Sequence, residues 1–435
     1  MACECTNTGL DIFTVPPVQT SVEHGCWVEY HPQAPVTDGS PVEFSINGDS
    51  EHYLDLANTF IHVQAKVLNA DNSALKDKED QVIPVNLFLH SLFSEVDISL
   101  NGTLVSASTN TYPFRAYLET VLNYGKDAKE SQLNLAGYYN EGGPHFGVDE
   151  DDENAGYQAR VNSIANSRLV DMVGRVHADI FTQGKFLLSG VDLRTRFVRS
   201  KDSFALMAKA AAGKELSKYK IKMEHMSMFV RKAKLNPSIV LAHAKALQIS
   251  SAKYPIQRVV TRIYSIGANV MNFVKDSLFL SQKPQRLVIG FIESKAFNGD
   301  YGKNPFEFKH FNINSLALYS DGHQIPNKAL KPDFENKIYA RSYLSLFTGC
   351  GSGWKDNGLD ISYEDYSNGY TLFCFDLTPS MVDGHVSEPL KSGNIRLEVT
   401  FAKPLPEPVH VIVYGEQDGL IEIDRARQVI TDFAS

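Results

Sequence analysis

Cysteine and histidine are the residue types in this chain that could ligate a metal ion, so their spacing decides whether a metal site is expected. Cys3 and Cys5 are the closest pair among the five cysteines, and no second pair completes a four-ligand zinc site. None of the 13 histidines pairs with another at ligand spacing beside an acid. The HExxH, nucleophile-elbow and dinucleotide-binding motifs are also missing. We therefore expect no catalytic residues, no metal and no cofactor, and the chain is not expected to be an enzyme.

Two loops carry groupings that superficially match ligand sites. The acidic run from Asp149 to Glu153 could bind a hard cation, but it lacks the alternate-residue spacing of a calcium loop. Gly349, Gly351 and Gly353 are spaced like a phosphate loop, but no Lys-Ser or Lys-Thr follows them. We expect the acidic run to be an exposed loop tip.

Positive charge is concentrated in one stretch before residue 236. The chain as a whole carries a net charge of -9, which argues against a dedicated nucleic-acid binder because phosphate neutralisation requires surplus Lys and Arg. The basic stretch favours either a surface facing a polyanion or the solvent face of an edge strand. Its residues are Lys209, Lys214, Lys218, Lys220, Lys222, Arg231, Lys232 and Lys234.

The elements that position these residues occur in the same order in two halves of the chain. In each half an alternating strand leads into a tight turn, at Asn101-Gly102 and at Asp321-Gly322. Both dipeptides readily supply the positive φ of a two-residue hairpin. The other matching strands are 61–67 with 287–292, 172–181 with 370–377, and 191–197 with 395–401.

Each hairpin is followed by an amphipathic helix pattern, 113–124 in the first half and 333–347 in the second. We expect the helices to end in left-handed caps at Gly125 and Gly349. The ordered repetition predicts an internal duplication with diverged sequence.

The divider between the halves reads as a short linker helix. Asn236 can cap its first turn, and Pro237 suits the first helical position. The expected organisation is an N-terminal arm (1–39), a first domain (40–235), a linker helix (236–253), a second domain (254–416) and a C-terminal tail (417–435).

Length and composition place both domains in the all-β class. A chain of 435 residues exceeds what one core normally serves, and its short alternating strands between Gly, Pro, Asn and Asp clusters indicate antiparallel sandwiches or jelly rolls with few helices. No apolar run approaches the roughly 20 residues of a membrane helix, and the first residues lack signal-peptide features. We expect synthesis in the cytosol and reduced thiols.

The C-terminal segment carries apolar residues among charges. Burying each is worth on the order of 1.5 to 3 kcal/mol, so we expect them to pack on a neighbouring subunit or on the base of their own. They are Leu420, Ile421, Ile423, Val429, Ile430 and Phe433.

The whole pattern resembles the double jelly-roll major capsid proteins of double-stranded DNA viruses. More closely, it is similar to the capsid proteins of Polinton (Maverick) elements and adintovirus-like viruses. The similar stretches include LNPSIVLAHAKAL, LVIGFIESKAFNGDYGKNPFEFKHF, LALYSDGHQIPNKALKPDFEN, GYTLFCFDLTP and VIVYGEQDGLIEIDR, which are densest between residues 235 and 425. The similarity is thinner in the first half, where SEVDISLNGTLV carries most of it.

The resemblance implies two tandem antiparallel eight-stranded jelly rolls and a homotrimer that forms a pseudo-hexameric capsomer. It further implies contacts with neighbouring capsomers and with a penton protein at the vertices, and weak non-specific contact with packaged DNA. The location implied is the capsid of a virion, with synthesis in the host cytoplasm and assembly that could be nuclear. The family has no active-site residues to carry over.

Two other classes compete with the capsid interpretation. A two-domain β-sandwich could bind carbohydrate or protein through a loop face with Trp354, Tyr363, Tyr366 and Tyr370. A bicupin enzyme would need a His and carboxylate cluster in each half. The strand 172–181 supplies only His177 and Asp179, and its counterpart has no His.

Overall fold

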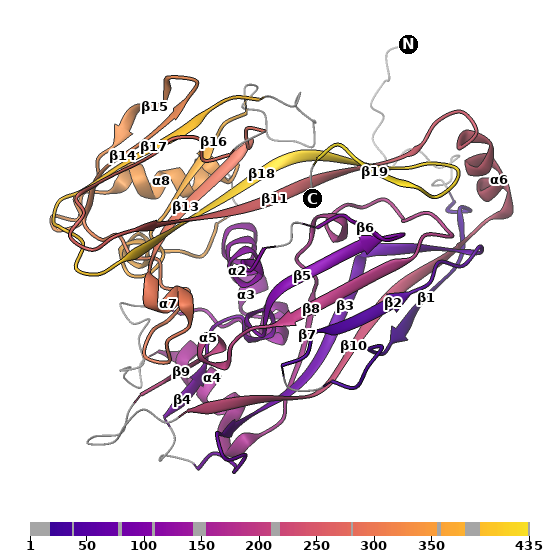
Figure 1. The fold of residues 1–435 in the computed structure, drawn as a ribbon, viewed down its shortest axis with the longest axis horizontal. Helices are drawn as coiled ribbons and strands as arrows, with labels where there is room; N and C mark the ends of the chain where they lie inside the picture. Colours follow the sequence, from indigo (N-terminus) through magenta and orange to yellow (C-terminus); the bar gives the residue numbers. More distant parts are fainter. Residues whose placement is uncertain are drawn as a thin grey trace, which may run out of the picture.

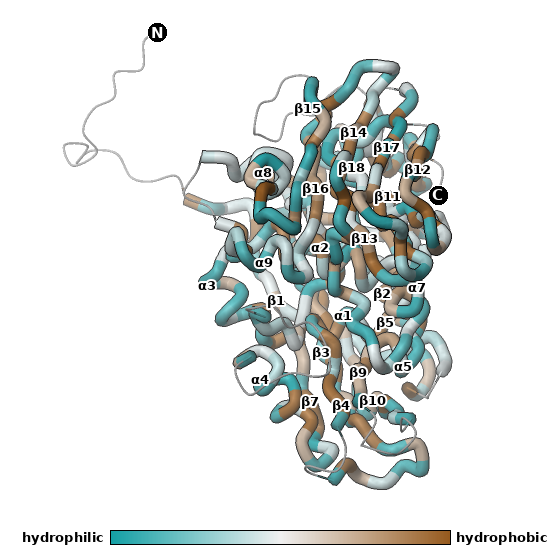
Figure 2. The backbone as a smooth tube through the Cα atoms, turned by 90° about the vertical axis from the view of Figure 1, so that its left-hand side faces the viewer, coloured by the Kyte–Doolittle hydropathy of each residue, from teal (hydrophilic) through white to brown (hydrophobic). Residues whose placement is uncertain are grey.

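A computed structural model describes residues 18–36, 39–76, 81–106, 109–141, 154–209, 218–279, 282–354, 358–378 and 392–433. The chain forms two β domains joined through one helix, α6 (Pro237–Ala246) (Figure 1). In Figure 2 the second domain lies above the first.

The first domain is a pair of four-stranded antiparallel sheets with the orders β1-β10-β3-β7 and β2-β8-β5-β6. Alternation of apolar and polar residues explains its strands, since Ile61, Val63, Ala65 and Val67 on β3 are all fully buried. The strands are β1 (Val22–Tyr30), β2 (Val42–Ile46), β3 (His52–Asn69), β5 (Phe93–Leu100), β6 (Thr103–Leu104), β7 (Val170–Arg175), β8 (Leu193–Arg199) and β10 (Tyr219–Leu235).

The second domain repeats this arrangement, with the orders β11-β18-β13-β16 and β12-β17-β14-β15. Position by position, each strand occupies the place of its counterpart in the first domain. The predicted duplication is therefore confirmed, and the fold is a double jelly roll. The strands are β11 (Ala252–Ile266), β12 (Asn272–Lys275), β13 (Arg286–Glu293), β14 (Ile313–Ser320), β15 (His323–Leu330), β16 (Leu372–Asp376), β17 (Ile395–Phe401) and β18 (Val409–Ile423).

Short elements fill the connections. Helix α2 (Tyr112–Asn123) follows the first hairpin and α8 (Ala340–Gly349) follows the second, as the repeat predicted, but α8 begins at Ala340 and not at the expected Asp333. Three further strands are β4 (Val82–Pro84), β9 (Leu206–Ala208) and β19 (Val429–Thr431). The other helices are α1 (Phe88–Ser91), α2 (Tyr112–Asn123), α3 (Lys126–Lys129), α4 (Ala155–Ile164), α5 (Asp202–Ala205), α7 (Ser294–Asn298), α8 (Ala340–Gly349) and α9 (Tyr363–Ser367), with 3-10 turns at Gln132–Ala136, Ala165–Ser167 and Asp179–Phe181.

In the sheet β11-β18-β13-β16, strand β13 is buried on both of its faces. On β13, Leu287 and Ile289 belong to the core of the second jelly roll, whereas Val288 and Ile292 join the core of the first domain. This explains why the sequence of β13 is almost continuously apolar, while β3 alternates. Figure 2 shows α2 and β13 in the layer between the two lobes. We call this layer the domain junction.

Several of the expected segments end at other residues than the sequence predicted. The N-terminal arm is shorter than 1–39, because Val22–Tyr30 forms β1 and pairs with β10. The linker helix ends before residue 253, because β11 begins at Ala252. The strand expected at 172–181 is β7 followed by a 3-10 turn. Hydrogen bonds to strands that are distant in sequence set where these segments end, and the local sequence does not reveal such bonds.

Candidate functional site

Both predicted hairpin turns have the backbone that the sequence indicated. Asn101 and Gly102 have φ values of 46° and 81°, and Asp321 and Gly322 have values of 49° and 85°. The side chains also tie these turns to other loops. Asn101 Oδ1 accepts from the Asp192 amide at 2.7 Å, and Asp321 Oδ1 accepts from the Asn394 amide at 2.9 Å.

The start of the linker helix also agrees with its sequence. Asn236 Oδ1 accepts a 3.0 Å hydrogen bond from the Ser238 amide, and Pro237 is the first residue of α6. Asn236 therefore satisfies a donor that the helix itself leaves unpaired.

The two glycine caps are wrong. Helix α2 ends at Asn123, the following Tyr124 has extended backbone, and Gly125, with a φ of -84°, precedes α3 instead. Gly349 is the last residue of α8, but its φ is not positive. A Cβ at Gly349 would lie 2.6 Å from the backbone carbon of Cys374, so glycine there allows α8 to approach β16.

The expected C-terminal tail is mostly part of the fold. Leu420, Ile421 and Ile423 lie on β18, which pairs with β11 as far as Ile423. Ile421 and Ile423 are fully buried within their own chain, so for these two residues the expected packing on their own subunit is found and packing on a neighbouring subunit is not. Val429 belongs to β19, which folds back onto β18, and Phe433 lies under the Arg258 guanidinium. Among the six, Ile430 is the exposed one in this structure, at 55%.

The domain junction is closed by aromatic rings. Tyr117 on α2 stacks on Phe306 of the second domain with ring centroids 4.3 Å apart, and Phe114 stacks on Phe297 at 5.4 Å. Tyr117 and Phe306 are fully buried. Stacked rings in a dry interface contribute beyond their area, so the two domains are held as one block.

Buried charges fix the relative position of the domains at the same place. Arg115 Nη1 lies 2.7 Å from Asp179 Oδ1, and Asp179 also accepts from the Val259 amide of the second domain at 3.2 Å. Arg115 Nε lies 2.8 Å from Glu119, which contacts His177 Nδ1 at 2.6 Å. Burial raises the pKa of Glu119, but Arg115 and His177 outweigh it, and the pKa falls to about 2. Removing one partner would leave an uncompensated buried charge.

A polar pocket of about 330 Å³ lies beside this network. Its lining combines Arg115 and Glu119 of the first domain with Gln257 and Glu416 of the second. Gln257 Nε2 donates to Glu416 at 2.8 Å. Both glutamates are paired with arginines of the same chain, Glu119 with Arg115 and Glu416 with Arg286. The pocket is therefore not a strongly charged ligand site.

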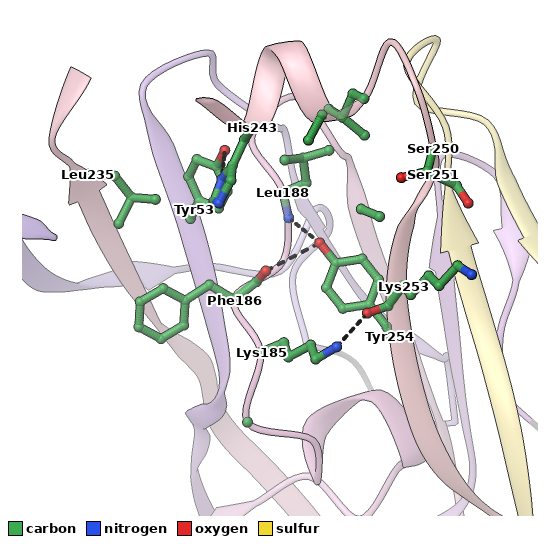
Figure 3. Close-up of a pocket in the computed structure, with 14 residues that line it drawn as sticks. Tyr53, Lys185, Phe186, Leu188, Leu235, His243, Ser250, Ser251, Lys253 and Tyr254 are labelled. Carbon is green, nitrogen blue, oxygen red and sulfur yellow. Dashed lines mark hydrogen bonds between the residues drawn. The ribbon is translucent and has the colours of Figure 1, made fainter. Parts of the chain in front are cut away.

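An apolar groove of about 490 Å³ lies beneath α6 (Figure 3). It lies at what we call the linker end, where β1 starts, β18 ends and α6 connects the domains (Figure 1, right). Tyr53 and His243 meet at its upper wall, with the Tyr53 hydroxyl 3.1 Å from His243 Nδ1. Tyr254 forms its floor, where the hydroxyl donates to the Phe186 carbonyl at 3.2 Å. Sequence patterns did not indicate this groove, because its lining comes from distant segments.

The surface around the groove is also apolar. Helix α6 has no buried residue, Leu241 on it is 58% exposed, and Ile249 after it is 90% exposed. Exposed apolar side chains beside an apolar groove are typical of an interaction surface.

The basic stretch is largely neutralised where the structure describes it. Arg231 pairs with Asp55 at 3.0 Å, and Lys232 pairs with Asp49 at 2.9 Å. Lys222 lies 3.1 Å from Glu224 on the same strand. Most of this charge is therefore balanced by carboxylates of the same chain. Lys214, like the acidic run 149–153 and the Cys3 and Cys5 pair, lies outside the described residues.

The two competing classes required a metal cluster or an exposed aromatic loop face. No group of three or more His, Cys, Asp or Glu side chains there could hold a metal ion. Of the four loop aromatics, Tyr366 and Tyr370 are buried, which leaves Trp354 and Tyr363 exposed. Within the residues described, no helix is both long and apolar enough to cross a membrane.

Comparison with known proteins supports the fold over the whole chain. No protein-family model matches. An uncharacterised protein of Caenorhabditis elegans is 25% identical over 430 residues, which cover 96% of this chain and 99% of that protein.

The similar solved structures are viral. A chain in the structure of the Sputnik virophage has a TM-score of 0.64 at 13% identity, over 100% of this chain and 94% of that one. The Faustovirus major capsid protein has a TM-score of 0.57 at 9% identity, over 94% and 92% of the two chains. The mavirus major capsid protein has 0.55 at 11% identity, over 98% and 93%. At such identities the likeness establishes the double jelly-roll fold.

Proposed function

We propose that this protein is a major capsid protein whose trimers form pseudo-hexameric capsomers of an icosahedral shell around double-stranded DNA. The observation that carries the proposal is the union of two equivalent eight-stranded jelly rolls into one rigid block. Viral capsid proteins match that block along almost their whole length.

The geometry supports this function physically. Three copies of a block with two similar lobes present six similar lobes around one axis. A single protein can then tile a flat facet through repeated symmetric contacts. Many weak lateral contacts together hold such a shell through effective concentration. The buried charges and stacked rings of the domain junction keep the lobes in fixed register, which this tiling requires.

The finer assignments extend the same proposal. The sequence resemblance supports a capsid protein of a Polinton or adintovirus-like element, located in the virion. Its partners would be neighbouring capsomers and a penton protein at the vertices. The ion pairs along β10 support only weak, non-specific contact with packaged DNA. We assign no catalytic role to the chain.

Measuring the mass of the purified protein by light scattering tests the proposal. We expect three chains of 48.4 kDa, about 145 kDa, and negative-stain images with a hexagonal outline roughly 70 to 90 Å across. A chain that stays at 48.4 kDa at all concentrations would contradict the capsid function and favour a monomeric binding protein.

A further inference from the structure

We propose that residues 10–15 of this chain bind in the apolar groove beneath α6 of the same chain. The proposal concerns a contact within one copy, so it does not depend on the capsid function. Residues 1–17 lie outside the described part of the chain, and three observations connect their sequence to the groove.

The first observation is the place where the described chain begins. Val22 pairs with Leu235, and the Asn236 amide donates to the Ser21 carbonyl at 2.9 Å. Leu235 itself lines the groove. Val15 is six residues before Ser21, and an extended chain of that length spans at most about 20 Å. So short a tether gives the segment a high effective concentration at its own groove.

The second observation is the match of apolar side chains. Residues 10–15 read LDIFTV, so four of the six are large and apolar. The groove offers apolar partners on its walls and floor, among them Phe186, Leu188, Leu235 and Tyr254 (Figure 3). A segment of this composition would otherwise expose side chains whose burial is favourable.

The third observation is charge. The groove lining includes Lys185 and Lys253, both exposed, and no carboxylate. Residues 1–17 contain Glu4 and Asp11 and no Lys or Arg. A second copy of α6 suits the groove less well, because that helix carries Lys245 and would bring positive charge to a positive rim.

Zero-length carbodiimide crosslinking of the full-length protein tests which occupant is present. We expect mass spectrometry to find an amide bond between the Asp11 carboxyl and the amine of Lys185 or Lys253. A mixture of unlabelled and ¹⁵N-labelled protein, assembled together before crosslinking, distinguishes a segment of the same chain from a segment of a neighbouring copy. Products of a single isotope support binding within one chain. Mixed-isotope products would overturn it in favour of a neighbouring copy.

A pair of matched variants tests the groove itself. Ala246 and Ala244 are both exposed on α6, but only Ala246 lines the groove. We expect backbone amides of residues 10–15 to exchange with solvent on the order of tenfold faster in Ala246→Glu than in the wild type, while Ala244→Glu matches the wild type. Equal exchange in all three proteins would overturn the proposal. The capsid function is tested separately by the mass of the trimer, so equal exchange would contradict only the groove proposal.

Discussion

Asn101 donates a 2.7 Å hydrogen bond from its side-chain Nδ2 to the backbone oxygen of Arg427. This bond joins the first hairpin of the first domain to the last hairpin of the chain. Arg427 Nε in turn donates to the Ser189 carbonyl at 2.8 Å. The C-terminal hairpin therefore acts as a clamp between the domains, in addition to extending the second sheet.

Replacing Arg427 with Ala should weaken this clamp. A hydrogen bond from a charged donor is lost and the Ser189 carbonyl loses its partner, so we expect the free energy of unfolding to fall by about 1 to 2 kcal/mol in urea titrations. Arg425→Ala is the matched control, because Arg425 is exposed on the same hairpin. Equal stability of the two variants would show that the clamp contributes nothing.

Replacing either hairpin glycine with a β-branched residue should destabilise the protein because of the backbone conformation alone. No atom lies within 4 Å of a Cβ built at Gly102 or Gly322, yet their φ values are 81° and 85°. We expect Gly102→Val and Gly322→Val each to lower the free energy of unfolding by roughly 1 to 3 kcal/mol. Asn adopts positive φ more readily, so Gly102→Asn should lose clearly less. Unchanged melting of both Val variants would argue against strain in these turns.

Replacing Gly349 even with alanine should destabilise the protein, because the added methyl group has no room. The added Cβ would lie 2.6 Å from the Cys374 backbone, so α8 must shift away from β16. We expect Gly349→Ala to lower the melting temperature by an amount equivalent to about 1 to 3 kcal/mol. Gly358→Ala provides the comparison, because nothing lies within 4 Å of a Cβ there. If both variants melt like the wild type, the contact between α8 and the Cys374 backbone can accommodate a methyl group and the prediction is wrong.

The first domain should become less stable in mild acid because of His90, which is buried on α1 between Tyr112 and His177. Burial, together with the nearby His177, lowers the pKa of His90 well below 6.5. The ring therefore stays neutral in the folded protein while the unfolded chain gains a proton below pH 6.5. Stability is lost as the pH falls, at about 1.4 kcal/mol per pH unit for one proton.

Urea titrations at pH 7.5 and pH 5.5 measure this effect. We expect His90→Gln to lose less stability between the two conditions than the wild type does. Glu119 contributes in a separate window, because its pKa of about 2 lies below the ordinary 4.5 and its stabilisation is lost between these values. An identical pH response of His90→Gln and the wild type would exclude His90 as the cause.

Local sequence was sufficient for features that depend on a few neighbouring residues. The Asn-Gly and Asp-Gly turns follow from the conformational freedom of those residues. Asn236 and Pro237 mark a helix start because capping acts within one turn. The repeated order of strand, turn and helix identified the duplication, and the alternation on β3 identified one buried face, because side-chain period follows backbone geometry.

Tertiary structure alone decided the features that depend on distant partners. Gly349 looked like a helix cap, but the nearby backbone of Cys374 explains it, and that residue belongs to another strand. From the sequence, Ile421 and Ile423 could have packed either on a neighbouring subunit or on their own, because their strand partners, Tyr254 and Ala252, lie at the other end of the domain in sequence. The groove beneath α6 and the charged junction around Arg115 were invisible for the same reason. Burial and charge pairing depend on which surfaces meet in space, and sequence patterns encode only the surface that each element offers.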